Sequence, residues 1–213
     1  MNYRVWVLLL LCWMPGWALA GSCTVLIVGD SLSSGYGLAA GKSWVDLLDA
    51  RLKKAAPPPK NKWRVINASV SGDTTQNGLQ RLQPALDRHH PQGVLIALGG
   101  NDALRGTPPA VIRQNLVTMI RQAKAAGAWV ALLEAPVLPN YGKPYADAVA
   151  KLYVDVAREE SIIRVPCFVC DVAIAPGMMQ ADGIHPNEKA QPRMLDAVWP
   201  HIQPKLRCPA KKP

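Results

Sequence analysis

The sequence contains little that would divide it into separate units. Its 213 residues show no internal repeat, no interdomain linker and no low-complexity region beyond a short tail at 209–213. After the first 20 residues, no second apolar run is long enough for a membrane-spanning helix. Residues 21–213 are therefore expected to form one compact domain with a sizeable core.

Nucleic-acid binding is not indicated either, although the formal net charge is +9. The basic residues are scattered, with small clusters at 51–62 and 205–212, and aromatic residues do not interleave with them as a base-stacking surface would require. We interpret the charge as a solvated basic surface. A weak attraction to anionic membrane surfaces or to acyl-CoA-like substrates is the functional alternative.

Residues 1–20 have the pattern of a secretory signal peptide. MNYR gives a positive start, VWVLLLLCWMPGWALA follows as an apolar stretch, and Ala18-Leu19-Ala20 is a typical cleavage signal. The apolar run is short for a transmembrane helix, so an uncleaved anchor is the minor alternative. We therefore predict that the protein acts in the periplasm, or is secreted, after cleavage behind Ala20.

Short apolar segments alternate with amphipathic ones along the rest of the chain. The apolar segments lack a period of two, which is typical of strands covered on both faces. Right-handed crossovers then predict an α/β fold, a three-layer α/β/α sandwich with a five-stranded parallel, flavodoxin-like sheet. The expected strands are 24–28, 64–67, 94–98, 129–133 and 162–165, and the expected helices are 44–53, 75–88, 109–125, 145–159 and 189–204.

A serine stands near the start of the chain and an aspartate–histidine pair near its end. Ser31 follows the apolar run CTVLIVGD and precedes a glycine-rich turn, so it is expected at the carboxyl end of the first strand, where parallel sheets bind ligands. Asp182 and His185 stand together in DGIHPN. A serine hydroxyl needs an imidazole to take its proton and a carboxylate to orient that imidazole. These three residues therefore predict a hydrolytic triad.

Two further turns offer hydrogen-bond donors. Gly72 lies in SGD after the second expected strand, and Asn101 lies in GGND after the third. A glycine can bring its backbone N–H close to a substrate, and an asparagine amide is a neutral donor, so both suit an oxyanion hole. Their alternatives are a positive φ angle at the glycine and a turn role for the asparagine. We interpret the neighbouring Asp30, Asp73 and Asp102 as structural.

The order of these blocks resembles that of a known family. GDSL, SGD, GGND and DGIHPN fall in the order of the four blocks of the SGNH (GDSL) hydrolases. NASVSGDTTQNGLQRL, ALGGNDALRG and LPNYGKPY look most like the periplasmic branch of acyl-CoA thioesterases, lysophospholipases and arylesterases. The resemblance covers about residues 24–202. Ala103, where close relatives often have glycine, and the segment 134–139 depart from the branch pattern, which bears on substrate scope more than on chemistry.

The resemblance implies a role for each residue. Ser31 would be the nucleophile, His185 the general base and later acid, and Asp182 the orienting carboxylate. The N–H groups of Ser31 and Gly72 and the side-chain amide of Asn101 would form the oxyanion hole. The implied activity is that of a serine esterase on small-molecule esters, lysophospholipids or acyl thioesters, without a metal or organic cofactor. Two alternatives remain open, a carbohydrate O-deacetylase on the same fold and a non-catalytic envelope binding domain.

Loops around the expected site carry apolar side chains that could line an acyl channel. Flexible methionines among them suit varied chains. Ordinary loop packing is the alternative for each, and the sequence specifies no oligomeric state. The candidate substrate-binding residues are Leu32, Leu104, Leu138, Tyr141, Met178 and Met179.

Four cysteines follow the leader, which allows three pairings. With Ser31 at the carboxyl edge of the sheet, Cys23 enters the first strand at the opposite edge, and the last helix descends to leave Cys208 near it. Cys167 and Cys170 both follow the fifth expected strand. We therefore predict Cys23–Cys208 and Cys167–Cys170 bridges. Free thiols are the alternative, above all for the tight second pair. A zinc site would need further ligands at suitable spacing, and none is evident.

Overall fold

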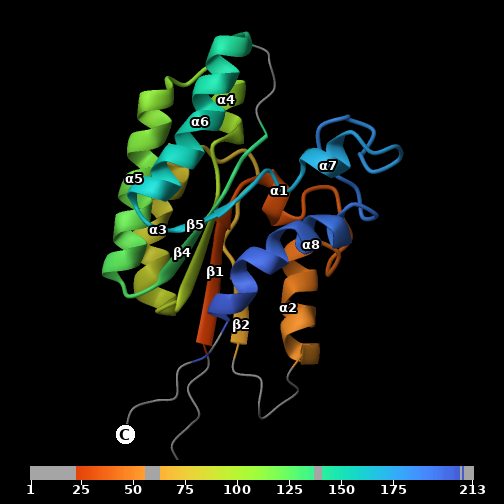
Figure 1. Ribbon diagram of the computed structural model, residues 1–213. Coiled ribbons are helices and arrows are strands. Elements are labelled where there is room, and N and C mark those ends of the chain that lie inside the picture. Colours follow the sequence, from red (N-terminus) through yellow and green to blue (C-terminus); the bar gives the residue numbers. More distant parts are fainter. Residues whose placement is uncertain (1–22, 56–62, 137–140, 207, 209–213) are drawn as a thin grey trace, which may run out of the picture.

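The computed structural model describes residues 23–55, 63–136, 141–206 and 208, and it contains one parallel sheet (Figure 1). The strands lie in the order β2-β1-β3-β4-β5, and each neighbouring pair is parallel. This is the strand order of flavodoxin-like sheets, in which the winding direction reverses between β1 and β3. The strands are β1 at Cys23–Gly29, β2 at Trp63–Asn67, β3 at Gly93–Ala97, β4 at Trp129–Leu133 and β5 at Ile163–Val165.

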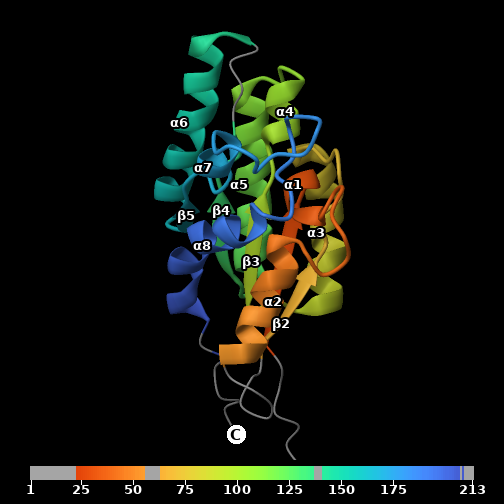
Figure 2. The same cartoon turned by 90° about the vertical axis from the view of Figure 1, so that its right-hand side faces the viewer.

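Helices cover both faces of this sheet (Figures 1 and 2). α3, α5 and α6 pack on one face, while α2 and α8 pack on the other. The fold is therefore the three-layer α/β/α sandwich that the sequence predicts. These helices are α2 at Trp44–Ala55, α3 at Thr75–His89, α5 at Pro109–Ala125, α6 at Lys143–Glu159 and α8 at Gln191–Ile202.

The interior strand β1 shows why the apolar segments lack a period of two. Every residue of β1 is buried. Leu26 and Val28 join the core beneath α3, α5 and α6, while Val25 and Ile27 join the core beneath α2 and α8. Because each face of the sheet meets a helical layer, side chains on both faces leave water, and each contributes roughly 1.5–3 kcal/mol to folding.

Three short helices at the carboxyl edge of the sheet were not predicted. They are α1 at Ser31–Ser34, α4 at Gly100–Leu104 and α7 at Cys170–Ala173. A helix of four or five residues is too short to display a period of 3.6, so the sequence pattern could not reveal them. The longer helices were predicted with ends that differ from the observed ones by no more than two residues, except that the chain after Ile202 turns into a 3₁₀ segment at Gln203–Lys205.

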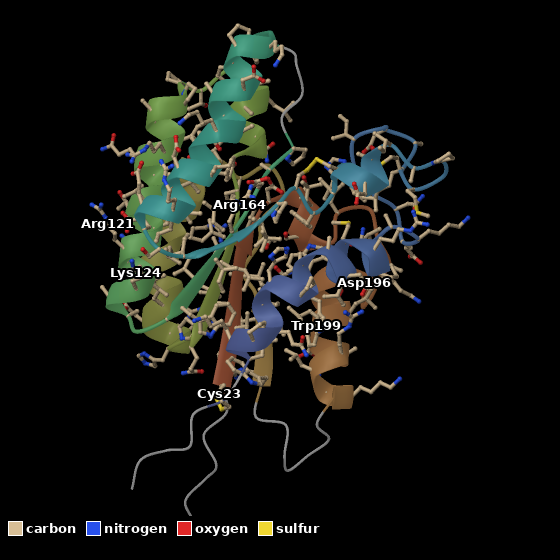
Figure 3. All side chains as sticks on the ribbon, in the orientation of Figure 1. Cys23, Arg121, Lys124, Arg164, Asp196 and Trp199 are labelled. Atoms are coloured by element: carbon tan, nitrogen blue, oxygen red, sulfur yellow. A yellow bond between two sulfur atoms is a disulfide. The ribbon has the colours of Figure 1, made fainter. Side chains whose placement is uncertain are left out.

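Two disulfides join the cysteines, in the pairing predicted from the strand directions. Cys23, at the lower end of β1 in Figure 3, is bonded to Cys208 beyond α8, with 5.8 Å between the Cα atoms. Cys167 is bonded to Cys170 near the opposite edge of the sheet, with 5.5 Å between the Cα atoms. The predicted leader at 1–20 lies outside the described residues. Within the described ranges, no helix has the length and apolar character that crossing a membrane requires.

Candidate active site

Ser31 follows the carboxyl end of β1 and is the first residue of α1. The helix is capped by Asp30, whose Oδ1 accepts a hydrogen bond from the Leu32 backbone N–H at 3.0 Å. Gly35 ends the helix with a φ of 84°, a left-handed conformation that glycine adopts at little cost. These two caps limit α1 to a single turn and so fix Ser31 at the carboxyl edge of the sheet.

The loop after α7 brings His185 to this serine. The His185 Nε2 lies 2.9 Å from the Ser31 Oγ, and the Nδ1 lies 2.7 Å from the Asp182 Oδ2. Hydrogen bonds to Asp182 from the backbone and ring of His185, and from the Ile184 backbone, lower the pKa of that carboxyl to about 2. An ionised carboxylate accepts and cannot donate, so Nδ1 of the neutral ring carries the proton and Nε2 is left to accept from Ser31.

Local hydrogen bonds fix the loop that carries the histidine. The Gln180 backbone N–H donates to the His185 carbonyl at 2.8 Å, and Met179 pairs with Pro186 in an isolated antiparallel bridge. The Tyr36 ring packs against the imidazole, with 4.6 Å between the ring centroids. The short Asp-x-x-His spacing therefore forms a self-contained turn, whose histidine then meets a serine 154 residues earlier in the chain.

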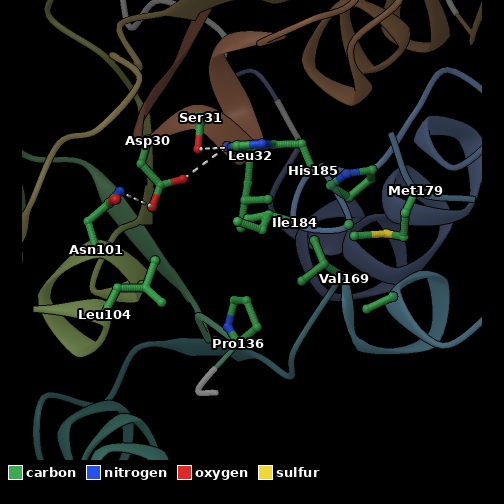
Figure 4. Close-up of a pocket in the computed structure, with 14 residues that line it drawn as sticks. Asp30, Ser31, Leu32, Asn101, Leu104, Pro136, Val169, Met179, Ile184 and His185 are labelled. Atoms are coloured by element: carbon green, nitrogen blue, oxygen red, sulfur yellow. Dashed lines mark hydrogen bonds between the residues drawn. The ribbon is translucent and has the colours of Figure 1, made fainter. Parts of the chain in front are cut away.

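Asn101 reaches the same place from the next strand. It lies on α4, directly after β3, and its Nδ2 donates to the Asp73 carbonyl at 3.0 Å and to the Asp30 Oδ2 at 3.4 Å. Figure 4 shows Asn101 beside Asp30, with Ser31 adjacent. β1 and β3 are the strands between which the winding direction reverses, so their carboxyl ends form the natural crevice of this sheet.

Gly72 follows β2 and has a φ of 83°, so a side chain there would be strained. Its carbonyl accepts from the Arg105 Nη2 at 3.2 Å. The glycine itself is exposed and does not line the cavity beside Ser31. The structure thus brings Ser31, Asn101 and His185 together around one cavity, with Gly72 in the adjoining turn.

The three aspartates interpreted as structural are all buried. Asp73 pairs with Arg81, and Asp102 accepts hydrogen bonds from the backbone N–H and the hydroxyl of Thr75. Asp30 is the electrostatically unusual member of the three. Burial raises its pKa to about 6, against smaller lowering effects from the Leu32 N–H and from His185.

A cavity of about 250 Å³ opens beside the serine and the histidine (Figure 4). Of the predicted substrate-binding residues, Leu32, Leu104 and Met179 line it. Met178 does not; it packs against the core beneath α2 and α8. Tyr141 does not either, because its ring packs on Tyr145 and its hydroxyl donates to the Leu104 carbonyl at 3.4 Å.

Leu138 lies outside the described residues. Five further apolar or small side chains line the cavity without having been predicted, namely Pro136, Val169, Ala173, Ile184 and Pro186. Val169 carries a core-like sequence signal, because it is apolar and lies between other apolar residues. The spacing of the Cys167–Cys170 pair could have directed attention to this segment, but not to the direction in which its side chains point.

Comparison with known proteins agrees with this geometry. Residues 27–192 match the model of the GDSL-like lipase/acylhydrolase family. The chain belongs to that family. It is 47% identical over 187 residues to "Esterase TesA" of Pseudomonas aeruginosa, which covers 88% of this chain and 91% of the relative.

Two further similarities extend this family assignment. The chain is 41% identical over 185 residues to "Thioesterase 1/protease 1/lysophospholipase L1" of Escherichia coli strain K12, covering 87% of this chain and 86% of the relative. A crystal structure of TesA superposes with a TM-score of 0.81 at 48% identity, covering 86% of this chain and 99% of that one. Similarity over nearly the whole described chain means that the family's fold and ester-hydrolase character apply to this domain as a unit.

Proposed function

We propose that this protein hydrolyses carboxylic esters and thioesters through an acyl-enzyme on Ser31. The observation that carries the proposal is the chain of two hydrogen bonds from the Ser31 Oγ through His185 to Asp182, at 2.9 and 2.7 Å. The family membership supports the same conclusion. His185 acts as the general base, and Asp182 holds its ring in the productive tautomer.

The proposed reaction proceeds in two halves. The Ser31 Oγ attacks the carbonyl carbon while its proton moves to the His185 Nε2, and the carbonyl oxygen becomes an oxyanion. His185 then gives that proton to the departing alcohol or thiol, which leaves an ester on Ser31. A water molecule, deprotonated by His185, attacks this ester and releases the acid and the free serine.

Hydrogen-bond donors stabilise the oxyanion in both halves. We assign this role to the backbone N–H groups of Ser31 and Gly72 and to the side-chain amide of Asn101. Asn101 donates to the Asp73 carbonyl at 3.0 Å and to Asp30 at the longer distance of 3.4 Å. The longer hydrogen bond, to Asp30, is the weaker of the two. We therefore assign the N–H that makes it as the donor to the oxyanion.

The shape of the cavity favours an apolar acyl group. Leucine, isoleucine, valine, proline and methionine side chains dominate its wall, whereas a carbohydrate O-deacetylase would need a shallow polar groove. We therefore propose small-molecule substrates with apolar acyl chains, such as aryl esters, lysophospholipids and acyl thioesters.

Hydrolysis of p-nitrophenyl esters with acyl chains from acetyl to dodecanoyl tests the proposal. The leaderless chain should hydrolyse several members, and Ser31→Ala should lower kcat by at least about 1,000-fold. Ser34→Ala is the matched control, because that hydroxyl lies on the same helix and bonds to the Ser71 hydroxyl at 2.8 Å. An unchanged rate in Ser31→Ala would exclude Ser31 as the nucleophile, and a parent without activity on any ester would refute the function.

We also propose that residues 1–20 direct export and that the domain at 21–213 acts in the periplasm. Mass spectrometry of the protein recovered from the periplasmic fraction tests this directly. The expected mature chain begins at Gly21. A protein that retains Met1 in the membrane fraction would instead indicate an uncleaved anchor. Weak attraction of the basic surface to anionic membranes would appear as salt-sensitive binding to phosphatidylglycerol vesicles.

A further inference from the structure

The Cys167–Cys170 disulfide encloses a segment that serves two environments at once. Phe168 packs in the core with its ring centroid 5.6 Å from that of Trp44. Val169, the next residue, belongs to the same core cluster. It also lines the cavity beside Ser31, as does Ala173. The Ala173 backbone N–H donates to the Val169 carbonyl at 2.9 Å, so the two cavity residues are one helical turn apart.

We propose that this disulfide determines the acyl-chain specificity of the esterase by holding Val169 and Ala173 as one wall of the acyl pocket. The inference rests on the proposed function and adds a positioning pair, Cys167 and Cys170, to it. In Figure 4, Val169 and Met179 lie across the cavity from Asn101 and Leu104. Val169 therefore lies on the side of the cavity opposite Asn101, the side-chain donor that we assign to the oxyanion hole.

The helix that carries this wall is short. α7 has four residues, a single turn, and isolated helices of this length are unstable in water. Val169 stands at the N-cap position, where its apolar side chain cannot cap the helix. Ile174, directly after the helix, is 85% exposed. Core packing of Phe168, Val169 and Val172 holds one side of this turn. The Cys167–Cys170 disulfide adds a covalent constraint at its start.

The part of the substrate that this wall contacts follows from the two half-reactions. The alcohol or thiol departs after the first half, while the acyl group stays on Ser31 until water removes it. An apolar cavity that adjoins the Ser31 Oγ suits the group that must remain bound in both halves. We therefore assign Val169 and Ala173 to the acyl chain rather than to the leaving group.

The second disulfide provides a matched control within the same chain. Cys23 and Cys208 join the start of β1 to the end of the chain, and neither residue lines the cavity. Removing this bridge also deletes one disulfide and two sulfur atoms. If the loss of a disulfide loosens the whole fold, both double variants should change their chain-length preference. If the pocket wall moves, only Cys167→Ser/Cys170→Ser should change it.

The experiment compares Cys167→Ser/Cys170→Ser with Cys23→Ser/Cys208→Ser on two ester series. In the first series the acyl chain grows from acetyl to decanoyl on a constant p-nitrophenol. For Cys167→Ser/Cys170→Ser we expect kcat/KM for octanoyl and decanoyl esters to fall roughly fivefold or more through KM, while kcat/KM for the acetyl ester stays within about twofold. For Cys23→Ser/Cys208→Ser the ratio of decanoyl to acetyl kcat/KM should stay at the parent value.

The second series keeps the acetyl group constant and lengthens the alcohol. Neither double variant should change its preference there. An unchanged acyl profile in folded Cys167→Ser/Cys170→Ser would overturn the inference, and so would a change confined to the alcohol series. Absence of hydrolysis in the parent would instead refute the proposed function, so the two failures are distinguishable.

A second measurement covers the case in which Cys167→Ser/Cys170→Ser does not fold. In folded Cys23→Ser/Cys208→Ser, Cys167–Cys170 is the disulfide that remains among the described cysteines. Dithiothreitol transfers two electrons and two protons to it, yielding two thiols and the cyclic disulfide of the reagent. Activity on the acyl series before and after reduction, with thiols counted by alkylation and mass spectrometry, should show the same loss of long-chain preference. An identical profile in the fully reduced, folded protein would overturn the inference.

Discussion

The two edges of the sheet are constructed differently. At the carboxyl edge, three helices of four or five residues and the loop at 180–187 carry the polar groups of the site. Hydrogen bonds there join neighbours in the chain, such as Asp182 with His185, and also different turns, such as His185 with Ser31 and Asn101 with Asp30. At the amino edge, Cys23 is bonded to Cys208 across 185 residues, and the Trp63 Nε1 donates to the Leu206 carbonyl at 3.1 Å.

This difference indicates that the carboxyl edge carries the catalytic groups, whereas the amino edge joins distant parts of the chain. The site is an assembly of turns that meet at the crevice between β1 and β3, so an exposed polar residue there, such as Asp182, can be changed without opening the core. The amino edge holds distant parts of the chain together, so a change there acts on stability. Substitutions of the catalytic residues at the carboxyl edge and of the disulfide at the amino edge should therefore affect different measurements.

Replacing the orienting carboxylate should have the largest effect. Asp182→Asn keeps the side-chain shape but removes the charge that holds the His185 Nδ1 proton, so the ring can present the wrong tautomer to Ser31. We expect kcat to fall by about 1,000- to 10,000-fold with little change in the thermal midpoint. Steady-state kinetics on the preferred p-nitrophenyl ester measures the first quantity, and calorimetry measures the second.

Asp147→Asn is the control for this substitution, because that exposed carboxylate pairs with Lys143 on α6, away from the cavity. Its rate should match the parent. If Asp182→Asn lost activity and several kilocalories of stability together, the carboxyl edge would be a structural element as well, and the proposed separation of the two edges would be wrong.

Removing the disulfide at the amino edge should lower the stability of the fold and leave kcat nearly unchanged. A bridge that closes a loop of this length is expected to stabilise the fold by about 3–5 kcal/mol, mainly by restricting the unfolded chain. Cys23→Ser/Cys208→Ser should lose that amount in guanidinium unfolding while kcat at 25 °C stays within about twofold. A large fall in kcat of the fully folded variant would show that the amino edge positions the site.

Two asparagines near the carboxyl edge separate a residue of the site from one that only caps a helix. Asn101→Ala removes the side-chain donor of the oxyanion site, so we expect kcat to fall about 100- to 1,000-fold with a smaller change in KM. Asn77→Ala removes one half of the capping box that Thr74 and Asn77 form at the start of α3, so it should cost about 1 kcal/mol of stability and leave kcat unchanged. A small kcat effect at Asn101 would assign its amide a structural role toward Asp73 and Asp30.

Sequence reasoning succeeded where local pattern determines position. Apolar runs such as 129–133 fix the strands, and the strand directions fix which edge each cysteine pair reaches. The Asp182-x-x-His185 spacing requires a turn in which the two side chains meet, and the structure contains that contact. Each of these features depends on a few consecutive residues or on the order of the elements.

Sequence reasoning failed where a loop side chain chooses between two directions. Met178 and Met179 are adjacent and chemically identical, yet the first packs in the core and the second lines the cavity. The residue type does not separate them. The direction in which each side chain points depends on the bridge between Met179 and Pro186. Val169 was missed for the same reason, since its direction depends on α7 and on the Cys167–Cys170 bond.

Asp30 combines a role in stability with a place beside the nucleophile. This carboxyl caps α1 beside the nucleophile, yet it is 3% exposed and its pKa is raised by burial from 3.8 to about 6. A raised pKa means that the folded protein binds the proton more tightly than the unfolded chain does. The stability that this group contributes is therefore complete below about pH 4 and is lost as the pH rises through 6, by a total of about 3 kcal/mol.

Asp30→Asn removes this titration but keeps an oxygen that can accept from the Leu32 N–H. The free energy of unfolding of the parent, minus that of Asp30→Asn, should therefore fall by about 2–3 kcal/mol between pH 4 and pH 8. Urea unfolding at half-unit pH intervals measures this difference. A constant difference would show that the ionised carboxylate is as well stabilised in the fold as in water, by Leu32 and by the Asn101 amide at 3.4 Å. Asp30 would then belong to the locally satisfied groups of the carboxyl edge, and the cost of burying charge beside Ser31 would be negligible.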